Sequence, residues 1–180
     1  MITIIDYGVG NINAFVNVYK RVDVPVKIAK TAADLEGAEK LILPGVGHFD
    51  HAMNQLNNSG MREKLDDLVL NQKIPVIGIC VGMQMMANNS DEGEVEGLKW
   101  IDATVKKFDE TKIHQVTRLP HMGWNDVKPV KDISLFQGLE KEAIFYFLHT
   151  YYFHCNQAQD ILAVSEYGGE FASAAHHDNI

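Results

Sequence analysis

The sequence contains little cysteine and no long apolar segment. Only two of its 180 residues are cysteine, too few for a disulfide framework, which excludes the Cys-rich secreted scaffolds and favours a reducing, cytoplasmic location. No apolar run approaches the roughly 18 residues that a membrane-spanning helix requires. The apolar start, residues 1–6, is too short for a signal-peptide core and has no basic segment before it. We therefore expect no association with a membrane.

Positive charge is also scarce. Sixteen Lys and Arg residues stand against 24 Asp and Glu residues, which gives a formal net charge of −8. Because this balance disfavours contact with phosphate backbones and anionic lipids, we expect no binding to nucleic acid. The hydrophobic content of 46% and the charged content of 22% exclude a disordered chain. The length predicts a single domain over residues 1–180.

The first half alternates short apolar segments with helical patterns. Thr31 with Asp34 matches a capping box and predicts a short helical turn. Short strands that alternate with helices predict a parallel sheet covered by helices on both faces. The expected strands cover residues 2–6, 25–28, 40–43 and 75–79, and the expected helices cover about 11–21, 48–57, 61–70 and 80–87.

The second half is rich in strand patterns and poor in helical ones, which predicts antiparallel pairs. Neither an internal repeat nor a linker separates the two halves. We therefore expect an α/β domain with an open mixed sheet and a β-rich second half. The strand-like segments are residues 103–108, 116–119, 124–128, 143–148, 151–154 and 162–167.

A candidate nucleophile, Cys80, lies where the fourth expected strand meets a helix. Gly78-Ile79-Cys80-Val81-Gly82 is the cysteine version of the G-x-S-x-G nucleophile elbow. A sharp turn strains the nucleophile's backbone, so its neighbours two residues away must be small. The following helix start is expected to favour the thiolate and lower its pKa, and the Val81 amide to face an oxyanion. A buried structural cysteine is the alternative interpretation, and it is the one that we favour for Cys155.

A second glycine turn, Pro44-Gly45-Val46-Gly47-His48, follows the third expected strand. Its amides are able to approach a ligand closely, although an ordinary strand-to-helix turn has the same composition. Both glycine turns lie at the carboxyl ends of parallel strands, where ligands bind in open α/β sheets.

Five motifs in this order resemble one enzyme family, the glutaminase subunits of imidazole glycerol phosphate synthases. These subunits are class I, triad-type glutamine amidotransferases with a flavodoxin-like fold. The resemblance covers the whole chain, and the second and fourth motifs favour this branch over the GMP, CTP and anthranilate enzymes. The motifs are Asp6-Tyr7-Gly8-Val9-Gly10-Asn11, Leu43-Pro44-Gly45-Val46-Gly47, Gly78-Ile79-Cys80-Val81-Gly82-Met83-Gln84, Pro120-His121-Met122-Gly123-Trp124-Asn125 and Phe145-Tyr146-Phe147-Leu148-His149-Thr150-Tyr151.

The resemblance implies hydrolysis of L-glutamine, without a cofactor, to glutamate and ammonia. A (β/α)8-barrel cyclase, bound as a heterodimer, would use the ammonia to make imidazole glycerol phosphate for histidine. Cys80 would form a glutamyl thioester, and His149 would lie in the pocket or the interface. The other matching positions are Gly45, Val46, Gly47 and Val81 for the oxyanion hole, Gln84, Glu92, Thr150 and Tyr151 for glutamine, and Asn11, His121, Met122, Trp124 and Tyr146 for the partner.

The sequence departs from this family at the catalytic base. The family carries its triad His and Glu in a glycine-x-Gln-Phe-His-Pro-Glu motif, which these 180 residues do not contain. His176 and His177 fall short of the matching position, and we interpret them as solvated residues at a fraying terminus. The domain is therefore expected to be C-terminally incomplete, and the 180-residue polypeptide to have little or no glutaminase activity.

Two other functions fit the same residues. A closely similar glutaminase could serve sugar amidation in surface-polysaccharide synthesis, or the chain could be a non-catalytic subunit that only binds a barrel partner. The eight histidines show no metal-ligand spacing, so no metal site is expected. Gly8-Val9-Gly10 lacks the third glycine of a dinucleotide fingerprint.

Overall fold

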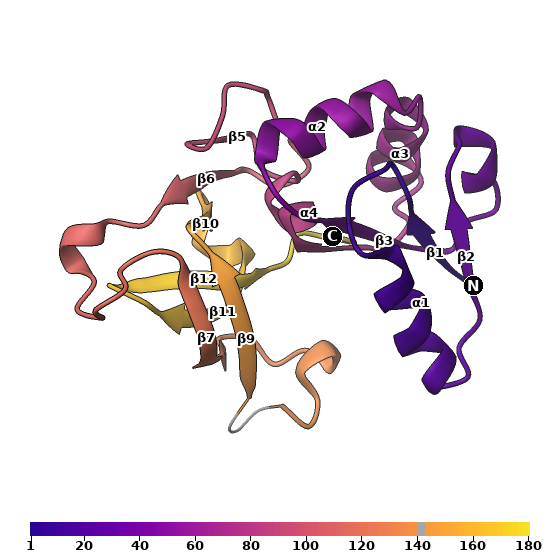
Figure 1. Ribbon diagram of the computed structural model, residues 1–180. Coiled ribbons are helices and arrows are strands. Elements are labelled where there is room, and N and C mark those ends of the chain that lie inside the picture. The colour runs from indigo at the N-terminus through magenta and orange to yellow at the C-terminus, as the bar shows by residue number, and fades with distance from the viewer. Residues whose placement is uncertain (140–142) are drawn as a thin grey trace.

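A computed structural model describes residues 1–139 and 143–180. Its strands divide among three sheets and do not form one continuous sheet. The first sheet is parallel, has the order β2-β1-β3-β4 and belongs to the first half of the chain, as expected (Figure 1). Its strands are β1 (Ile2–Ile5), β2 (Val26–Ala29), β3 (Lys40–Gly45) and β4 (Val76–Cys80).

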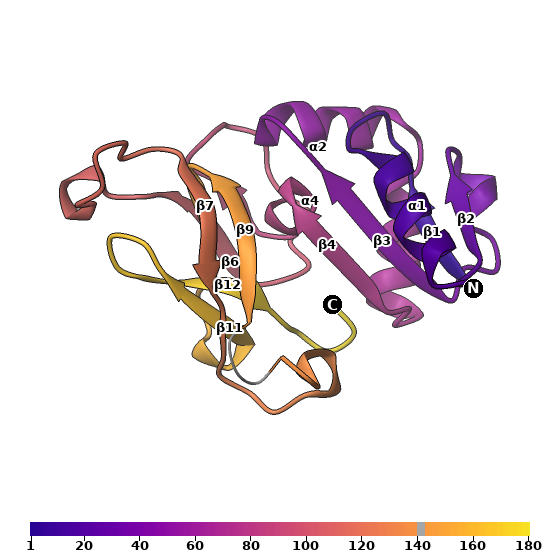
Figure 2. The same cartoon turned by 60° about the horizontal axis from the view of Figure 1, so that its bottom comes forward.

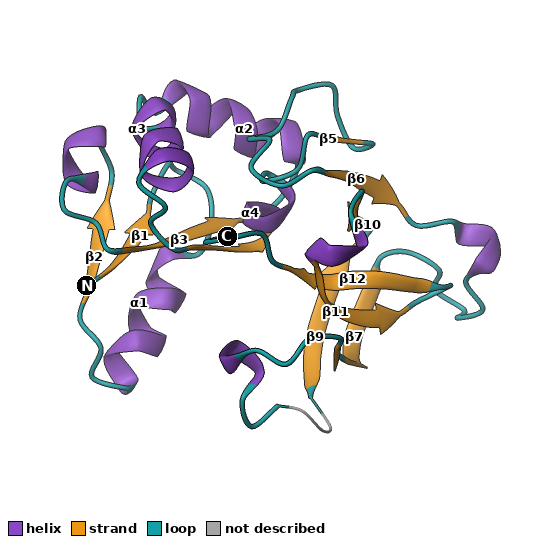
Figure 3. Cartoon of the chain, turned by 180° about the vertical axis from the view of Figure 1, so that it is seen from behind, coloured by secondary structure: helices purple, strands orange, loops and turns teal. Residues whose placement is uncertain are grey.

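Helices cover both faces of this parallel sheet, as the sequence predicted. Figures 1 and 3 show α1 (Ile12–Arg21) on one face and α2 (Phe49–Asn58) with α3 (Arg62–Asp66) on the other. The two faces are covered unequally. Helix α2 buries an apolar stripe with helical spacing, whereas no residue of α1 is fully buried. The expected capping box forms at Thr31, where both reciprocal hydrogen bonds are present.

The second half contains two sheets, which confirms its β-rich, antiparallel character. The larger sheet has the order β5-β6-β10-β12-β11-β8 and is antiparallel except for the β5–β6 pair. The smaller sheet pairs β7 (His121–Asp126) with β9 (Ile144–His149), which lie side by side in Figure 2. The strands of the larger sheet are β5 (Asn89–Ser90), β6 (Ala103–Lys107), β8 (Lys128–Pro129), β10 (Tyr151–Cys155), β11 (Ile161–Glu166) and β12 (Glu170–Ala175).

Several expected elements differ in the structure. Residues 116–119 form no strand, and Val116 is fully exposed, so its apolar side chain packs against nothing. The helix after Cys80 is also shorter than predicted. Helix α4 (Val81–Gln84) ends three residues before Ala87, because the Met85 and Ala87 carbonyls accept hydrogen bonds from the loop at 98–101 instead of continuing the helix.

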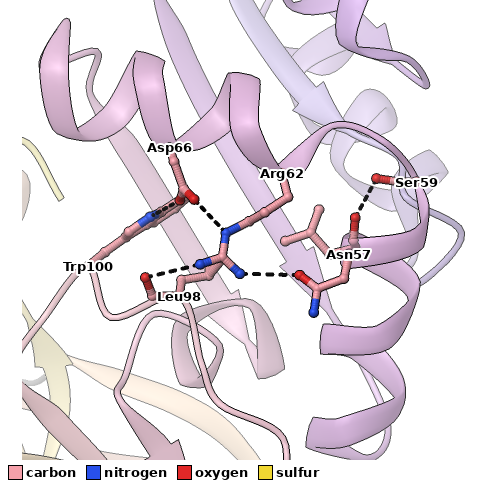
Figure 4. Close-up of polar contacts among 7 residues, drawn as sticks. Asn57, Ser59, Arg62, Asp66, Leu98 and Trp100 are labelled. Atoms are coloured by element: carbon pink, nitrogen blue, oxygen red, sulfur yellow. Dashed lines mark hydrogen bonds and ion pairs between the residues drawn. The ribbon is translucent and has the colours of Figure 1, made fainter.

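A polar cluster fastens that loop to α3. Asp66 accepts hydrogen bonds from Trp100 Nε1 and from Arg62 Nε, each over 2.7 Å (Figure 4). The Arg62 guanidinium also reaches Asn57 Oδ1 and the Leu98 carbonyl. Since the Leu98 amide in turn donates to Met85, the cluster supports the segment that follows the candidate nucleophile.

One large hydrophobic core continues from the parallel sheet into the β-rich half. Met85 and Met86 are buried and belong to the same cluster as Val105, Phe153 and the buried Cys155. The shared core fixes the second half against the elbow. Within residues 1–139 and 143–180, no helix combines the length and apolar character needed to cross a bilayer.

Candidate active site

Cys80 occupies the strained turn that the sequence predicted. It is the last residue of β4, immediately before α4, and has φ +58° and ψ −122°. A positive φ is uncommon for a residue with a side chain and costs of order 1–3 kcal/mol. The surrounding structure must impose this conformation, as in a nucleophile elbow.

The flanking glycines explain how the turn is imposed. An added Cβ at Gly78 would lie 2.7 Å from the Met83 backbone, and one at Gly82 would lie 1.9 Å from the Leu43 carbonyl oxygen. The turn therefore packs main chain against main chain on both sides of Cys80. This confirms the reason given for the small residues two positions away.

The electrostatic prediction for the thiol is wrong. Burial is the main influence on Cys80 and raises its pKa, and the Glu92 carboxylate adds to the increase. A hydrogen bond from the Val81 amide opposes them without reversing the direction. Helix α4 has only four residues, so its terminus does not offset desolvation. The Val81 amide lies at the thiol, and its role as an oxyanion donor stays a prediction.

The second glycine turn lies beside this elbow. Gly45 is the register partner of Cys80 in the parallel β3–β4 pair. Gly47 has φ +85°, and Val46 is exposed between the two glycines. The structure thus brings Gly45 next to the nucleophile. The turn leads directly into α2. His48 caps the start of this helix, because its Nδ1 accepts a hydrogen bond from the Asp50 amide.

Tyr7 supports the glycine turn, a role that the sequence analysis missed. This buried phenol donates to the Pro44 carbonyl over 2.8 Å and contacts Met85 Sδ at 3.3 Å. Burial and the nearby Cys80 raise its pKa, so the phenol remains a donor. Its place in the first family motif was the available signal.

A groove of about 530 Å³ opens beside β4. Cys80, Gln84 and Tyr151 line it, and Gln84 Nε2 donates to the Tyr151 carbonyl over 3.0 Å. Most of its remaining lining is apolar and comes from β9, β10 and β12. Within the described residues β4 pairs only with β3, so its outer edge borders this groove.

Glu92 and Thr150 are not among the groove-lining residues. Glu92 Oε2 accepts from the Phe49 amide over 2.8 Å at the start of α2, which places this carboxylate next to the second glycine turn. Thr150 directly precedes Tyr151 and connects β9 to β10. The expected glutamine-binding residues therefore surround the elbow from two sides and do not share one cavity.

Comparison with known proteins decides the family. The model of "Glutamine amidotransferase class-I" matches residues 3–180. The imidazole glycerol phosphate synthase subunit HisH of Bdellovibrio bacteriovorus is 55% identical over 180 residues, covering 100% of this chain and 88% of the relative. The HisH subunit of Leptospira borgpetersenii is 48% identical with the same coverage. The chain belongs to the class I glutamine amidotransferases.

Solved structures agree on the amidotransferase fold. A crystal structure described as a glutamine amidotransferase superposes with a TM-score of 0.67 at 16% identity, covering 99% of this chain and 90% of the other. A glutamine amidotransferase from Thermotoga maritima gives a TM-score of 0.61 at 18% identity, covering 96% and 72%.

A catalytic base, which a triad-type amidotransferase requires, is not in contact with Cys80. Among residues 1–139 and 143–180 no histidine hydrogen-bonds the thiol, although all eight histidines are described. The His177 side chain is 43% exposed, as expected of a solvated residue, but its Nδ1 lies 3.0 Å from Oδ1 of the buried Asp160, a contact that the sequence did not predict. The same residues contain no group of three side chains arranged to hold a metal ion.

The residues expected to face the amidotransferase's partner divide between two sides of the β7–β9 sheet. Trp124 is 73% exposed, Met122 60% and Tyr146 54%. His121 is buried and points inward, because successive residues of a strand face opposite sides. Asn11 lies apart from this sheet and caps α1 by accepting from the Ala14 amide.

Proposed function

We propose that this protein is the glutaminase subunit of imidazole glycerol phosphate synthase. It hydrolyses L-glutamine to glutamate and ammonia, and a cyclase subunit uses the ammonia to form imidazole glycerol phosphate for histidine. The observation that carries the proposal is the strained Cys80 turn, in a chain that is 55% identical to a subunit with that name. A free catalytic thiol suits a reducing compartment such as the cytoplasm.

The chemistry at Cys80 is acyl transfer. The thiolate attacks the carboxamide carbon of glutamine, and the resulting oxyanion accepts hydrogen bonds from the Val81 amide and the Gly45–Gly47 turn. Collapse breaks the C–N bond, releases ammonia after protonation and leaves a glutamyl thioester. Water then cleaves the thioester to give glutamate and the free thiol. Because burial raises the thiol pKa, the first step requires a base to remove its proton.

Gln84, Glu92, Thr150 and Tyr151 are proposed to form the glutamine pocket around this centre. Gln84 holds the Tyr151 carbonyl, so the two act together as one wall. Glu92 is fixed through the Phe49 amide and retains its second oxygen for the substrate ammonium group. Glu92 is half-buried, and a carboxylate held in a fixed orientation forms a strong charge-assisted hydrogen bond with such a cation.

The exposed face of the β7–β9 sheet is the proposed cyclase-docking face. We define this face as Met122, Trp124, Ile144, Tyr146 and Leu148, which are all more than half exposed. Trp124 and Tyr146 are register partners, and their rings meet edge to face with centroids 5.6 Å apart. Paired exposed aromatics of this kind dominate binding energy in protein interfaces. The occupant is a (β/α)8-barrel subunit, and Asn11 is proposed as a further contact.

The test combines labelling of the nucleophile with partner binding. Because no described histidine contacts the thiol, labelling is carried out at alkaline pH, where Cys80 ionises without a base. A glutamine analogue that alkylates thiols, 6-diazo-5-oxo-L-norleucine, is expected to add once to the chain at Cys80, as measured by intact mass and peptide mapping, and not to Cys80→Ser. Cys155→Ser is the matched control and should label normally, because that thiol is buried in β10. Binding without labelling would support the non-catalytic alternative. Binding to a nucleotide-sugar-modifying partner and not to a cyclase, measured by calorimetric titration, would support the polysaccharide alternative.

A further inference from the structure

A line of hydrogen bonds runs through the protein between the β7–β9 sheet and the turn after Cys80. At its centre His121 Nδ1 and His149 Nε2, on register-paired residues, lie 2.8 Å apart. On one side Asn125 Nδ2 is 3.2 Å from His121 Nε2. On the other, His149 Nδ1 is 2.9 Å from the Tyr151 carbonyl, the same oxygen that Gln84 holds. The line thus ends at the proposed glutamine pocket.

The two ends of the line determine the position of every proton in it. The Tyr151 oxygen only accepts, so His149 carries its proton on Nδ1 and leaves Nε2 as an acceptor. His121 must then donate from Nδ1 and accept at Nε2. Asn125 satisfies that acceptor with its amide group, which also donates to the Glu166 carbonyl over 2.9 Å. Its Oδ1 accepts from the Asp126 amide, which fixes the orientation of the side chain.

This arrangement contains no place for an additional proton. A proton added to either ring would set two N–H groups against each other, or an N–H group against the Asn125 amide. Burial and the adjacent His149 lower the pKa of His121 to about 4, and burial lowers the pKa of His149. Both rings are therefore neutral at pH 7.

Neutral side chains surround the two rings. His121 stacks on Tyr167 with centroids 4.1 Å apart, and the Tyr167 phenol donates to the Arg118 carbonyl. Further titratable groups on the elements packed nearby are Asp126 on β7, Tyr151 and Tyr152 on β10 and Glu166 on β11, and the Cys80 thiol lies across the groove. Among the described residues, no carboxylate forms an ion pair with either histidine. The remaining ring contacts come from Phe108, Phe147 and Phe171.

We infer that Asn125, His121 and His149 are positioning residues for glutamine binding. We call these three residues the relay: each proton in their line of hydrogen bonds has one position, and the line holds the Tyr151 carbonyl in place to accept a hydrogen bond from Gln84 Nε2. The relay starts on β7, whose alternate residues Met122 and Trp124 belong to the cyclase-docking face. The pocket role rests on the proposed function.

Proton order is tested first, by ¹⁵N NMR of histidine-labelled protein. At pH 7 both rings are expected as Nδ1–H tautomers, with a coupling between His121 Nδ1 and His149 Nε2 across their hydrogen bond. Asn125→Asp replaces the donor by an acceptor, so it is expected to place a proton on His121 Nε2 and raise the titration midpoint of His121. A mere packing role would leave both observations unchanged. An Nε2–H tautomer in either wild-type ring would overturn the relay.

The pocket role is tested by the concentration dependence of Cys80 labelling with 6-diazo-5-oxo-L-norleucine. His121→Phe keeps the stacked ring but removes the relay, and is expected to raise the half-saturating concentration about 3- to 10-fold, as expected for one lost hydrogen bond. The maximal labelling rate should change less than 2-fold, because Cys80 and its oxyanion donors are unaltered. His154→Phe, at a strand histidine outside the relay, is the matched control and should behave as the wild type does.

Each outcome bears on the relay. A labelled wild type with unchanged half-saturation in both His121→Phe and Asn125→Asp overturns the pocket role alone. An unlabelled wild type overturns the proposed function and the pocket role together, while the tautomers still decide the proton order. Thermal unfolding of the two variants confirms that each is compared as a folded protein.

Discussion

The contact between Gly82 and β3 permits a sharp prediction about the nucleophile turn. In Gly82→Ala the new Cβ would lie 1.9 Å from the Leu43 carbonyl oxygen and 2.8 Å from the Leu43 carbonyl carbon. Real Cβ atoms almost never approach closer than 3.0 Å, so α4 and β3 must separate by at least 1.1 Å (3.0 minus 1.9). Both partners are main chain, and β3 is held between β1 and β4, so no side chain is able to move away instead.

The expected cost has a structural and a catalytic part. Overpacking destabilises by about 1–3 kcal/mol, and the reduced entropy of the unfolded alanine chain returns about 0.4–1 kcal/mol. A net loss of about 1.3 kcal/mol lowers the Tm of a chain this size by roughly 3–5 °C. The 1.1 Å separation also moves Cys80 away from Gly45 and its oxyanion turn. Misplacement by about 1 Å costs on the order of 100-fold in rate.

The assay measures Tm by scanning calorimetry and the maximal rate of Cys80 labelling by 6-diazo-5-oxo-L-norleucine. Gly37→Ala is the matched control, because Gly37 has φ +71° and open space around it. Backbone strain should lower the free energy of unfolding of this variant by about 1 kcal/mol, but its Cys80 should be labelled at the wild-type rate. If Gly82→Ala labels within 2-fold of the wild type and keeps its Tm, close packing does not hold the elbow and the reasoning is refuted.

Four other predictions follow from the structure. The 180-residue polypeptide with a cyclase partner should release glutamate at a near-background rate, because no described histidine contacts Cys80; robust turnover by a chain of verified mass would contradict this. Trp124→Ala should weaken cyclase binding by at least 10-fold in calorimetric titration with an unchanged Tm, and equal affinity would exclude the docking face. Asp66→Ala leaves Trp100 Nε1 without its acceptor and should lower the free energy of unfolding, measured in urea, by about 1–3 kcal/mol. The control Asp132→Ala changes a side chain with no ion pair or hydrogen bond among the described contacts and should lower it by less than about 0.5 kcal/mol. In the unfolded chain His121 takes up a proton near its ordinary pKa of about 6.5, whereas in the folded protein its pKa is about 4. The free energy of unfolding should therefore be highest above about pH 6.5 and fall by about 1–3 kcal/mol towards pH 4. An equal fall in His121→Phe would contradict the assignment of this pH dependence to His121.

Strand alternation explains the main error in placing the interface residues. The sequence pattern predicted a strand at 124–128, but β7 begins at His121. Had the strand been recognised over its full length, its two-residue period would have separated His121 from Met122 and Trp124. The same period would have added Ile144 and Leu148 to Tyr146 on the docking face.

The acidity of Cys80 shows a second kind of limit. A strand-to-helix junction suggests a helix terminus that stabilises the thiolate. The actual helix ends after four residues, because hydrogen bonds from the loop at 98–101 capture the carbonyls that would have continued it. Burial then dominates the pKa. Neither the length of α4 nor the burial is encoded in the motif itself.

The sequence alone determined the alternation of strands and helices, the position of the nucleophile turn and the family. These features depend on short-range patterns: a turn at Cys80 requires small residues two positions away, whatever the rest of the chain does. Only the tertiary structure decided that Gln84 holds Tyr151, that Glu92 is fixed at the start of α2 and that His121 joins His149. These partners are 67, 43 and 28 residues apart in sequence, and they meet because a shared core packs the β-rich half against the parallel sheet.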